Sequence, residues 1–142
     1  MLDQNTSAQL KTLLERLEGP IELVATLDGS DKSAKIQELV SEVAALSDLV
    51  TARFDGTNAR APSFGIAKAG EEPRVFFAGL PMGHEFTSLI LALLQTSGYA
   101  PKVSDEVLAN IKSLGVQSNF DVFVSLSCHN CPDVVQALNL IA

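Results

Sequence analysis

An internal repeat constrains the fold of this chain more than any other feature of its sequence. Residues 21–39, IELVATLDGSDKSAKIQEL, align without a gap to residues 120–138, FDVFVSLSCHNCPDVVQAL. Apolar residues match apolar residues through both strand-like runs, and the turn and the helix pattern that follow coincide as well. The alignment predicts that one strand–turn–helix unit is used twice, although any two such units would align passably. It places Cys128 on Gly29 and Cys131 on Lys32, so only the second copy carries thiols.

Hydrophobic spacing predicts the elements around the first copy. Leucines at helical spacing from Leu10 to Leu17 indicate an opening helix that Gly19 and Pro20 end. Short apolar runs predict strands at residues 21–27, 50–54, 63–68 and 74–80, and the last two are expected to form an antiparallel hairpin. The side chains expected to face inward from the next two helices are Ile36, Leu39, Val40, Val43 and Ala44, then Phe86, Leu89, Ile90, Leu93 and Leu94. The order αβαβ followed by ββα predicts an α/β unit with a mixed sheet.

The second half of the chain repeats the start of this order. Ser104 is the expected N-cap of a helix that buries Val107, Leu108, Ile111 and Leu114. A strand at residues 120–126 and a helix with Val134, Val135 and Leu138 on its inner face follow. We therefore expect a complete domain over residues 1–98, a connector over 99–103 and a truncated second domain over 104–142. A lone strand and helix cannot bury their apolar faces, so this part is expected to lean on the first domain, to pair with another molecule or to fray.

Composition and charge exclude several classes of function. The net charge is −7 and the isoelectric point is near 4.7, with no basic stripe, so we expect neither nucleic acid nor an anionic membrane surface as a partner. No apolar stretch approaches the roughly 20 residues that span a bilayer. The N-terminus lacks the pattern of a secretory signal, which predicts a cytoplasmic location. In that reducing compartment a structural disulfide is not expected.

The two cysteines of the chain stand in a C-x-x-C motif, Cys128-His-Asn-Cys131, at the predicted start of a helix. Backbone N–H groups and the helix dipole converge there and favour a thiolate at Cys128. The leading cysteines of such motifs have pKa values of roughly 3.5 to 7.5, so the thiolate is an active nucleophile at neutral pH. Cys128 is expected to attack a disulfide, and Cys131 to resolve the mixed intermediate. Pro132 suits the first helical turn, and His129 is either a cationic neighbour of the thiolate or an exposed turn residue.

Two other interpretations of the cysteine pair stay open at this point. A zinc site needs about four ligands. Beyond the cysteines and His129 the chain offers only His84, so a metal would have to bind across two chains, and we expect none. Two inert buried thiols are the other alternative, because free cysteine packs as a small hydrophobic residue.

The element order and the C-x-x-C motif on the repeat resemble a tandem thioredoxin-like domain. In such folds a proline at the place of Pro62, before the hairpin strand, forms a cis bond that faces the active-site turn; an ordinary loop proline is the alternative. More closely, the stretches SLSCHNCPDVVQALNL and PMGHEFTSLILALL are similar to the N-terminal region of the flavoprotein subunit of alkyl hydroperoxide reductase. The resemblance covers essentially the whole chain. It departs from the family in length, since the flavin and nicotinamide domains and the rest of the second fold are absent here.

This resemblance implies a place in an electron relay. The family's N-terminal region is two fused thioredoxin-like folds, of which only the second bears the dithiol. It accepts electrons from a body that binds FAD and NADH and passes them to a peroxiredoxin that destroys peroxides, as part of the response to oxidative stress. Carried over, Cys128 attacks, Cys131 resolves, and Glu85 matches an acid that modulates the dithiol. The alternative for Glu85 is a solvated glutamate at a helix start.

The resemblance also sets what this chain is expected to lack. We expect no cofactor on the chain itself, and we expect it to be inactive or only partly active alone. The parent protein is expected to be a homodimer that reduces peroxiredoxin with NADH. Two other functions stay open, namely a docking module that does not use its thiols and a free-standing thioredoxin or glutaredoxin analogue. The missing strands after Ala142 argue against the second of these.

Overall fold

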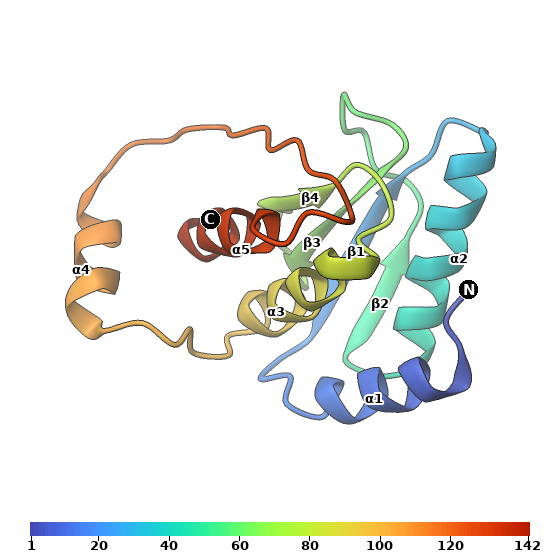
Figure 1. Ribbon diagram of the computed structural model, residues 1–142, viewed down its shortest axis with the longest axis horizontal. Helices are drawn as coiled ribbons and strands as arrows, with labels where there is room; N and C mark the ends of the chain where they lie inside the picture. Colours follow the sequence, from blue (N-terminus) through green and yellow to red (C-terminus); the bar gives the residue numbers. More distant parts are fainter.

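The computed structural model describes all residues from Met1 to Ala142. Its centre is a four-stranded mixed sheet with the strand order β2-β1-β3-β4 (Figure 1). β1 runs parallel to β2 and antiparallel to β3, and β3 forms an antiparallel hairpin with β4. The strands are β1 (Ile21–Thr26), β2 (Val50–Arg53), β3 (Ser63–Lys68) and β4 (Val75–Phe77). The predicted order of elements and the predicted hairpin are therefore confirmed for the first part of the chain.

Three of the helices begin at a polar side chain that caps them. The carboxylate of Asp3 and the hydroxyls of Ser30 and Ser104 each accept a hydrogen bond from the backbone N–H three residues later. This confirms the predicted cap at Ser104. The helices are α1 (Gln4–Leu14), α2 (Asp31–Ala45), the short 3-10 helix η1 (Gly83–Glu85), α3 (Phe86–Thr96), α4 (Asp105–Ser113) and α5 (Cys131–Ile141). None of them is both long and apolar enough to pass through a membrane.

The hydrophobic core lies against one face of the sheet. Alternate residues of β1, Ile21, Leu23 and Ala25, are buried, and Phe64 and Ile66 of β3 pair with two of them. The inward side chains of α1, α2 and α3 join them in a single cluster. The helical members are Leu10, Leu14, Ile36, Leu39, Val40, Val43, Leu89, Ala92, Leu93 and Leu94. The inner faces predicted for these helices are confirmed in the main, although Leu13, Ala44, Phe86 and Ile90 are only half-buried.

Several elements of this first part are shorter than predicted. α1 ends at Leu14, so Leu17 is buried from the turn that follows the helix. β4 covers three residues of the predicted run 74–80, because its ladder with β3 extends only from Phe64 to Ile66. The helix predicted from His84 begins with the 3-10 turn of η1, and α3 follows it.

The second part of the chain departs further from the prediction. Residues 120–126 form no strand, so the strand predicted there is wrong; no neighbouring strand offers them hydrogen-bonding partners. α4 and α5 contain no fully buried residue. Val107, Leu114 and Val134 are 44%, 61% and 53% exposed, so the inward positions predicted for them are wrong. In Figure 1, α5 lies beside α3, whereas α4 lies apart from the sheet, which explains why α4 buries so little.

Candidate functional site

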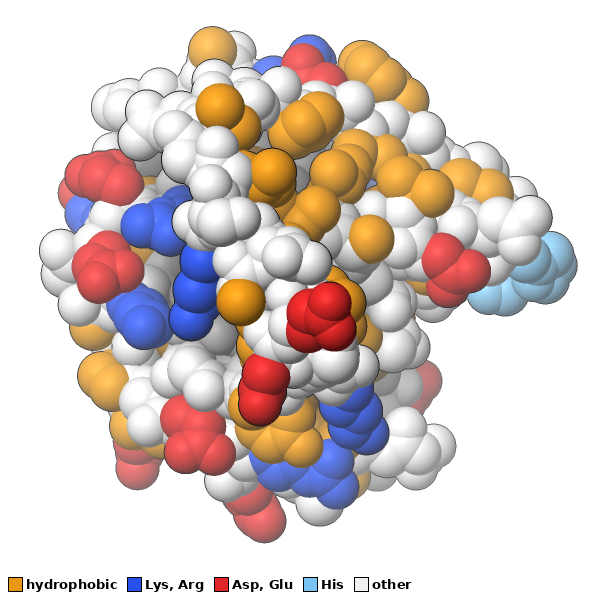
Figure 2. Space-filling model, turned by 90° about the vertical axis from the view of Figure 1, so that its left-hand side faces the viewer, with side chains coloured by type: hydrophobic (Ala, Val, Ile, Leu, Met, Phe, Trp, Pro, Cys, Tyr) orange, Lys and Arg blue, Asp and Glu red, His pale blue; other side chains and the backbone are white.

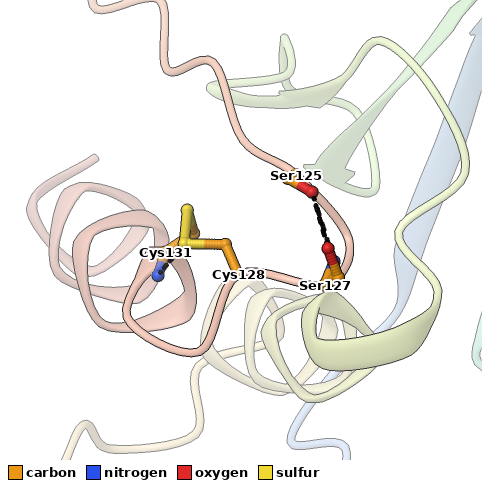
Figure 3. Close-up of a disulfide and its surroundings, with 4 residues drawn as sticks. All are labelled: Ser125, Ser127, Cys128 and Cys131. Carbon is orange, nitrogen blue, oxygen red and sulfur yellow. Dashed lines mark hydrogen bonds between the residues drawn. A yellow bond between two sulfur atoms is a disulfide. The ribbon is translucent and has the colours of Figure 1, made fainter.

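Cys128 and Cys131 form a disulfide at the start of α5, with their Cα atoms 5.5 Å apart (Figure 3). Cys131 is the first residue of α5, and its backbone N–H donates a hydrogen bond to the sulfur of Cys128 over 3.2 Å. The N–H of Cys128 donates to the carbonyl of Ser125 over 3.0 Å, which closes a turn ahead of the helix. The leading sulfur thus accepts an N–H at a helix N-terminus, an arrangement that favours a thiolate once the disulfide is reduced.

The surroundings of the pair are partly open to solvent. Both cysteines are half-buried, so the alternative of two inert buried thiols is wrong. Pro132 occupies the first turn of α5, where its missing N–H leaves no helical hydrogen bond unmade, as predicted. The hydroxyls of Ser125 and Ser127 lie 3.0 Å apart and hydrogen-bond to each other across the turn (Figure 3). Because both cysteines are partly exposed, the disulfide of another protein can reach this turn from solvent.

The structure brings His84 next to the motif, which sequence reasoning missed. The ring centroids of His84 and His129 lie 4.4 Å apart at an interplanar angle of 57°, and both side chains are exposed. His84 belongs to η1 and reaches the motif only through the packing of η1 against α5. No group of three or more His, Cys, Asp or Glu side chains is placed to hold a metal ion.

Glu85 is buried, so the alternative of a solvated glutamate at a helix start is wrong. The residue is 2% exposed, and neither of its carboxylate oxygens has a hydrogen-bond partner. Burying a carboxyl group without partners is costly, and such groups call for a specific explanation. Glu85 lies in η1, which packs against the helix that begins with Cys131. The acid that the resemblance singled out is therefore an unpartnered buried group beside the dithiol helix.

The bond between Ala61 and Pro62 is cis, so the predicted cis proline is confirmed and the ordinary loop proline is wrong. Its position belongs to the first copy of the repeat. Ser63, the next residue, pairs with Thr26 at the end of β1. Pro62 thus lies beside the turn at residues 27–32, where Gly29 and Lys32 stand in place of the cysteines.

That first-copy turn is held by a carboxylate in place of a dithiol. An Asp28 oxygen accepts hydrogen bonds from the Ser30 N–H over 3.0 Å, from the Ser30 hydroxyl over 2.5 Å and from the Ser33 hydroxyl over 2.7 Å. The two hydroxyls, Ser30 first, lower the pKa of Asp28 to about 2. The turn before α2 and the start of this helix therefore bind the carboxylate of Asp28, and they carry no redox group.

Besides the His84–His129 ring contact and a hydrogen bond from Arg74 to the Ala142 carbonyl over 3.4 Å, four contacts join the first part of the chain to the motif and its flanks. The His84 N–H donates to the Leu126 carbonyl over 3.2 Å. Gln136 of α5 donates to the hydroxyl of Ser88 over 3.1 Å. The two others involve Arg60, which forms an ion pair with Asp121 at 2.7 Å and lies 5.7 Å from the ring of Phe123. The sequence pointed to none of these contacts, although the repeat aligns Gln136 with Gln37.

No protein-family model matches the chain, whereas several curated relatives do. It is 54% identical over 142 residues to the F subunit of alkyl hydroperoxide reductase from Pseudomonas putida and 52% identical over 143 residues to that from Escherichia coli. Each match covers 100% of this chain and 27% of the relative. The chain matches the N-terminal region of the alkyl hydroperoxide reductase F subunit. It spans about a quarter of the length of these relatives.

Solved structures agree with this match to the reductase. The NTD_N/C domain of alkylhydroperoxide reductase from Enterococcus faecalis has a TM-score of 0.83 and 26% identity, over 99% of this chain and 74% of that one. A protein disulfide oxidoreductase from Aeropyrum pernix has a TM-score of 0.80 at 20% identity, over 100% of this chain and 68% of that one, a likeness of fold alone. The predicted thioredoxin-like α/β fold is confirmed. The C-x-x-C disulfide fits the redox pair of such a fold.

Proposed function

We propose that this chain is the dithiol relay of an alkyl hydroperoxide reductase flavoprotein subunit. It takes two electrons from the flavin-binding body of its parent protein and passes them to the disulfide of a partner peroxiredoxin in the cytoplasm. The observation that carries the proposal is the Cys128–Cys131 disulfide at the start of α5, with the Cys131 N–H on the leading sulfur. Similarity to the reductase F subunits over the whole chain supports it.

The proposed exchange balances in two steps. The Cys128 thiolate attacks one sulfur of the partner's disulfide, which forms a mixed disulfide and releases the partner's other sulfur as a thiolate. The Cys131 thiolate then attacks the Cys128 sulfur, closes the intramolecular disulfide and releases the second partner thiolate. The partner has gained two electrons, and its thiolates take protons from solvent. FAD and NADH on the rest of the parent protein supply the two electrons that reduce the pair again.

We further propose that residues 1–98 are a first fold, that 99–103 connect, and that 104–142 begin a second fold completed by strands of the parent protein. Large apolar side chains are exposed from the end of the connector onward: Val103, Val107, Leu114, Val116, Phe120, Val122, Phe123, Val124, Leu126, Val134 and Ile141. Figure 2 shows hydrophobic side chains gathered across this side of the molecule. A groove of about 590 Å³ between α3, α4 and α5 is lined by apolar residues that include Leu91, Val107 and Leu140. Added strands would cover these side chains and pair with residues 120–126.

Replacing Cys128 by serine in the protein encoded by the full gene tests the relay. We expect NADH-dependent reduction of the peroxiredoxin disulfide to fall to background. Transfer of electrons from NADH to an artificial acceptor that reacts at the flavin should persist, which controls for an intact flavin body. Unchanged peroxiredoxin reduction would contradict the relay and favour docking without thiols. A stop codon directly after Ala142 in the native gene would also contradict it.

A further inference from the structure

The hydrogen bond between Gln136 and Ser88 is the only side-chain hydrogen bond that joins α5 to α3. We propose that these two residues position the dithiol, because their contact fixes how α5, and Cys131 with it, is turned toward Cys128. The inference rests on the proposed redox function and deepens it. It makes the first fold, which has no thiols, part of the working relay.

One other side-chain hydrogen bond from the first fold reaches the end of α5: Arg74 donates to the carbonyl of Ala142, the residue after the helix, over 3.4 Å, at the end far from the dithiol. None of its residues is fully buried, so apolar packing sets only loosely which side of the helix faces α3. Ser88, in contrast, is 0% exposed, and Gln136 is its hydrogen-bond partner over 3.1 Å. Any other rotation of α5 would leave the buried hydroxyl of Ser88 without that partner, which costs free energy. The pair therefore selects one rotation of the helix.

The rotation at Gln136 reaches the dithiol through the helix backbone. Gln136 lies five residues beyond Cys131, about 7.5 Å along a stiff helix axis. The Cys131 N–H points at the Cys128 sulfur over 3.2 Å, so turning α5 moves this N–H relative to the sulfur. Hydrogen bonds weaken steeply once they lose their alignment. The pair thus supports a thiolate at Cys128 without touching it.

The repeat supplies a matched comparison inside the same chain. Gln37 stands at the place of Gln136 in the first copy, on α2, where it is exposed and makes no side-chain hydrogen bond. That copy has Gly29 and Lys32 in place of the cysteines. The glutamine has a hydrogen-bond partner only in the copy that carries the dithiol, as a positioning role predicts.

The test uses four variants of the protein encoded by the full gene: Ser88→Ala, Gln136→Met, both together, and Gln37→Met as the control. Methionine keeps the length of glutamine and removes the donor. The first measurement is the rate of Cys128 alkylation as a function of pH after reduction of the disulfide. The second is the fraction of the Cys128–Cys131 pair that is oxidised at equilibrium in a glutathione redox buffer. Thermal unfolding checks that each variant is folded.

We expect each single variant to slow alkylation at neutral pH by about two- to tenfold, the factor that corresponds to the free energy of one hydrogen bond. We also expect the pH profile of alkylation to shift to higher pH. The double variant should match the single variants, because both remove the same contact, and Gln37→Met should match the wild type. If Ser88→Ala does not fold, Gln136→Met alone decides, since that side chain is only half-buried. Folded variants that react like the wild type would contradict the positioning role of Ser88 and Gln136 and leave the proposed redox function standing. Effects of the two single variants that add up in the double variant would do the same. A wild-type dithiol that does not react would overturn the proposed function, and this role with it.

Discussion

Gly83 lies so close to Leu126 that a Cβ on the glycine would come within 2.9 Å of the Leu126 carbonyl oxygen. Gly83 has a φ of +58°, a conformation in which a side chain is strained, and the next residue donates its backbone N–H to that same carbonyl. η1 therefore holds the backbone two residues ahead of Cys128 through a contact that only glycine permits.

Gly83→Ala is expected to destabilise the protein and to disturb the redox turn. The positive φ alone costs an alanine about 1–2 kcal/mol, and the close carbonyl adds a clash that must displace the segment before Cys128. Gly70→Ala is the matched control, because Gly70 has a φ of +84° and an added Cβ atom would meet nothing within 4 Å. Urea unfolding should show a larger loss for Gly83→Ala than for Gly70→Ala, and only Gly83→Ala should change the rate of Cys128 alkylation. Equal losses with unchanged alkylation would contradict the contact.

Cys131→Ser should trap the partner protein. Cys128 would still attack the partner's disulfide, but no thiolate would then be present to resolve the mixed disulfide. Non-reducing electrophoresis of the full-length variant with an oxidised peroxiredoxin should show a covalent adduct that a reductant dissolves. Cys128→Ser is the control and should form no such adduct. An adduct with Cys128→Ser alone would reverse the roles of the two cysteines.

Local patterns predicted the first part of the fold because its elements pair and pack within it. β3 was predicted at residues 63–68 and is observed there, since both of its neighbours lie in the chain and the run is buried on both faces. Residues 120–126 match the apolar pattern of residues 21–27, which contain β1, but they have no strand to pair with, so the same kind of signal failed there. The cysteine pair could be found from its spacing, and Pro62 from its place before the hairpin strand together with the resemblance to thioredoxin-like folds. His84, Ser88 and the burial of Glu85 could not, because they depend on η1 and α3 packing against α5.

Asp28 should make stability depend on acid pH. Its pKa in the folded protein is lowered to about 2 by the hydroxyls of Ser30 and Ser33 and the Ser30 N–H, whereas a free aspartate titrates near 3.9. The contribution of the carboxylate is therefore fully present above about pH 4 and is lost as the pH falls toward 2. The stability difference between wild type and Asp28→Asn in urea should shrink over this range. Asp48→Asn, which removes a carboxylate that makes no hydrogen bond, is the control, and a difference that stays constant with pH would contradict the network.

Proteolysis should separate the two parts of the chain. Phe120 and Phe123 are 67% and 83% exposed and lie in a segment without regular hydrogen bonding, which is what a protease needs to bind an extended backbone. Chymotrypsin should cut the 142-residue chain at these two residues first and leave residues 1–98 intact, because their core is continuous. In the full-length protein the proposed strands would pair with this segment, and cleavage there should become slow.

The Arg60–Asp121 ion pair is exposed and gives little protection against the protease. Asp121→Asn is therefore the control and should leave the cleavage rates of both the short and the full-length chain nearly unchanged. Equal cleavage of the short and the full-length chains would show that no further strands cover residues 120–126.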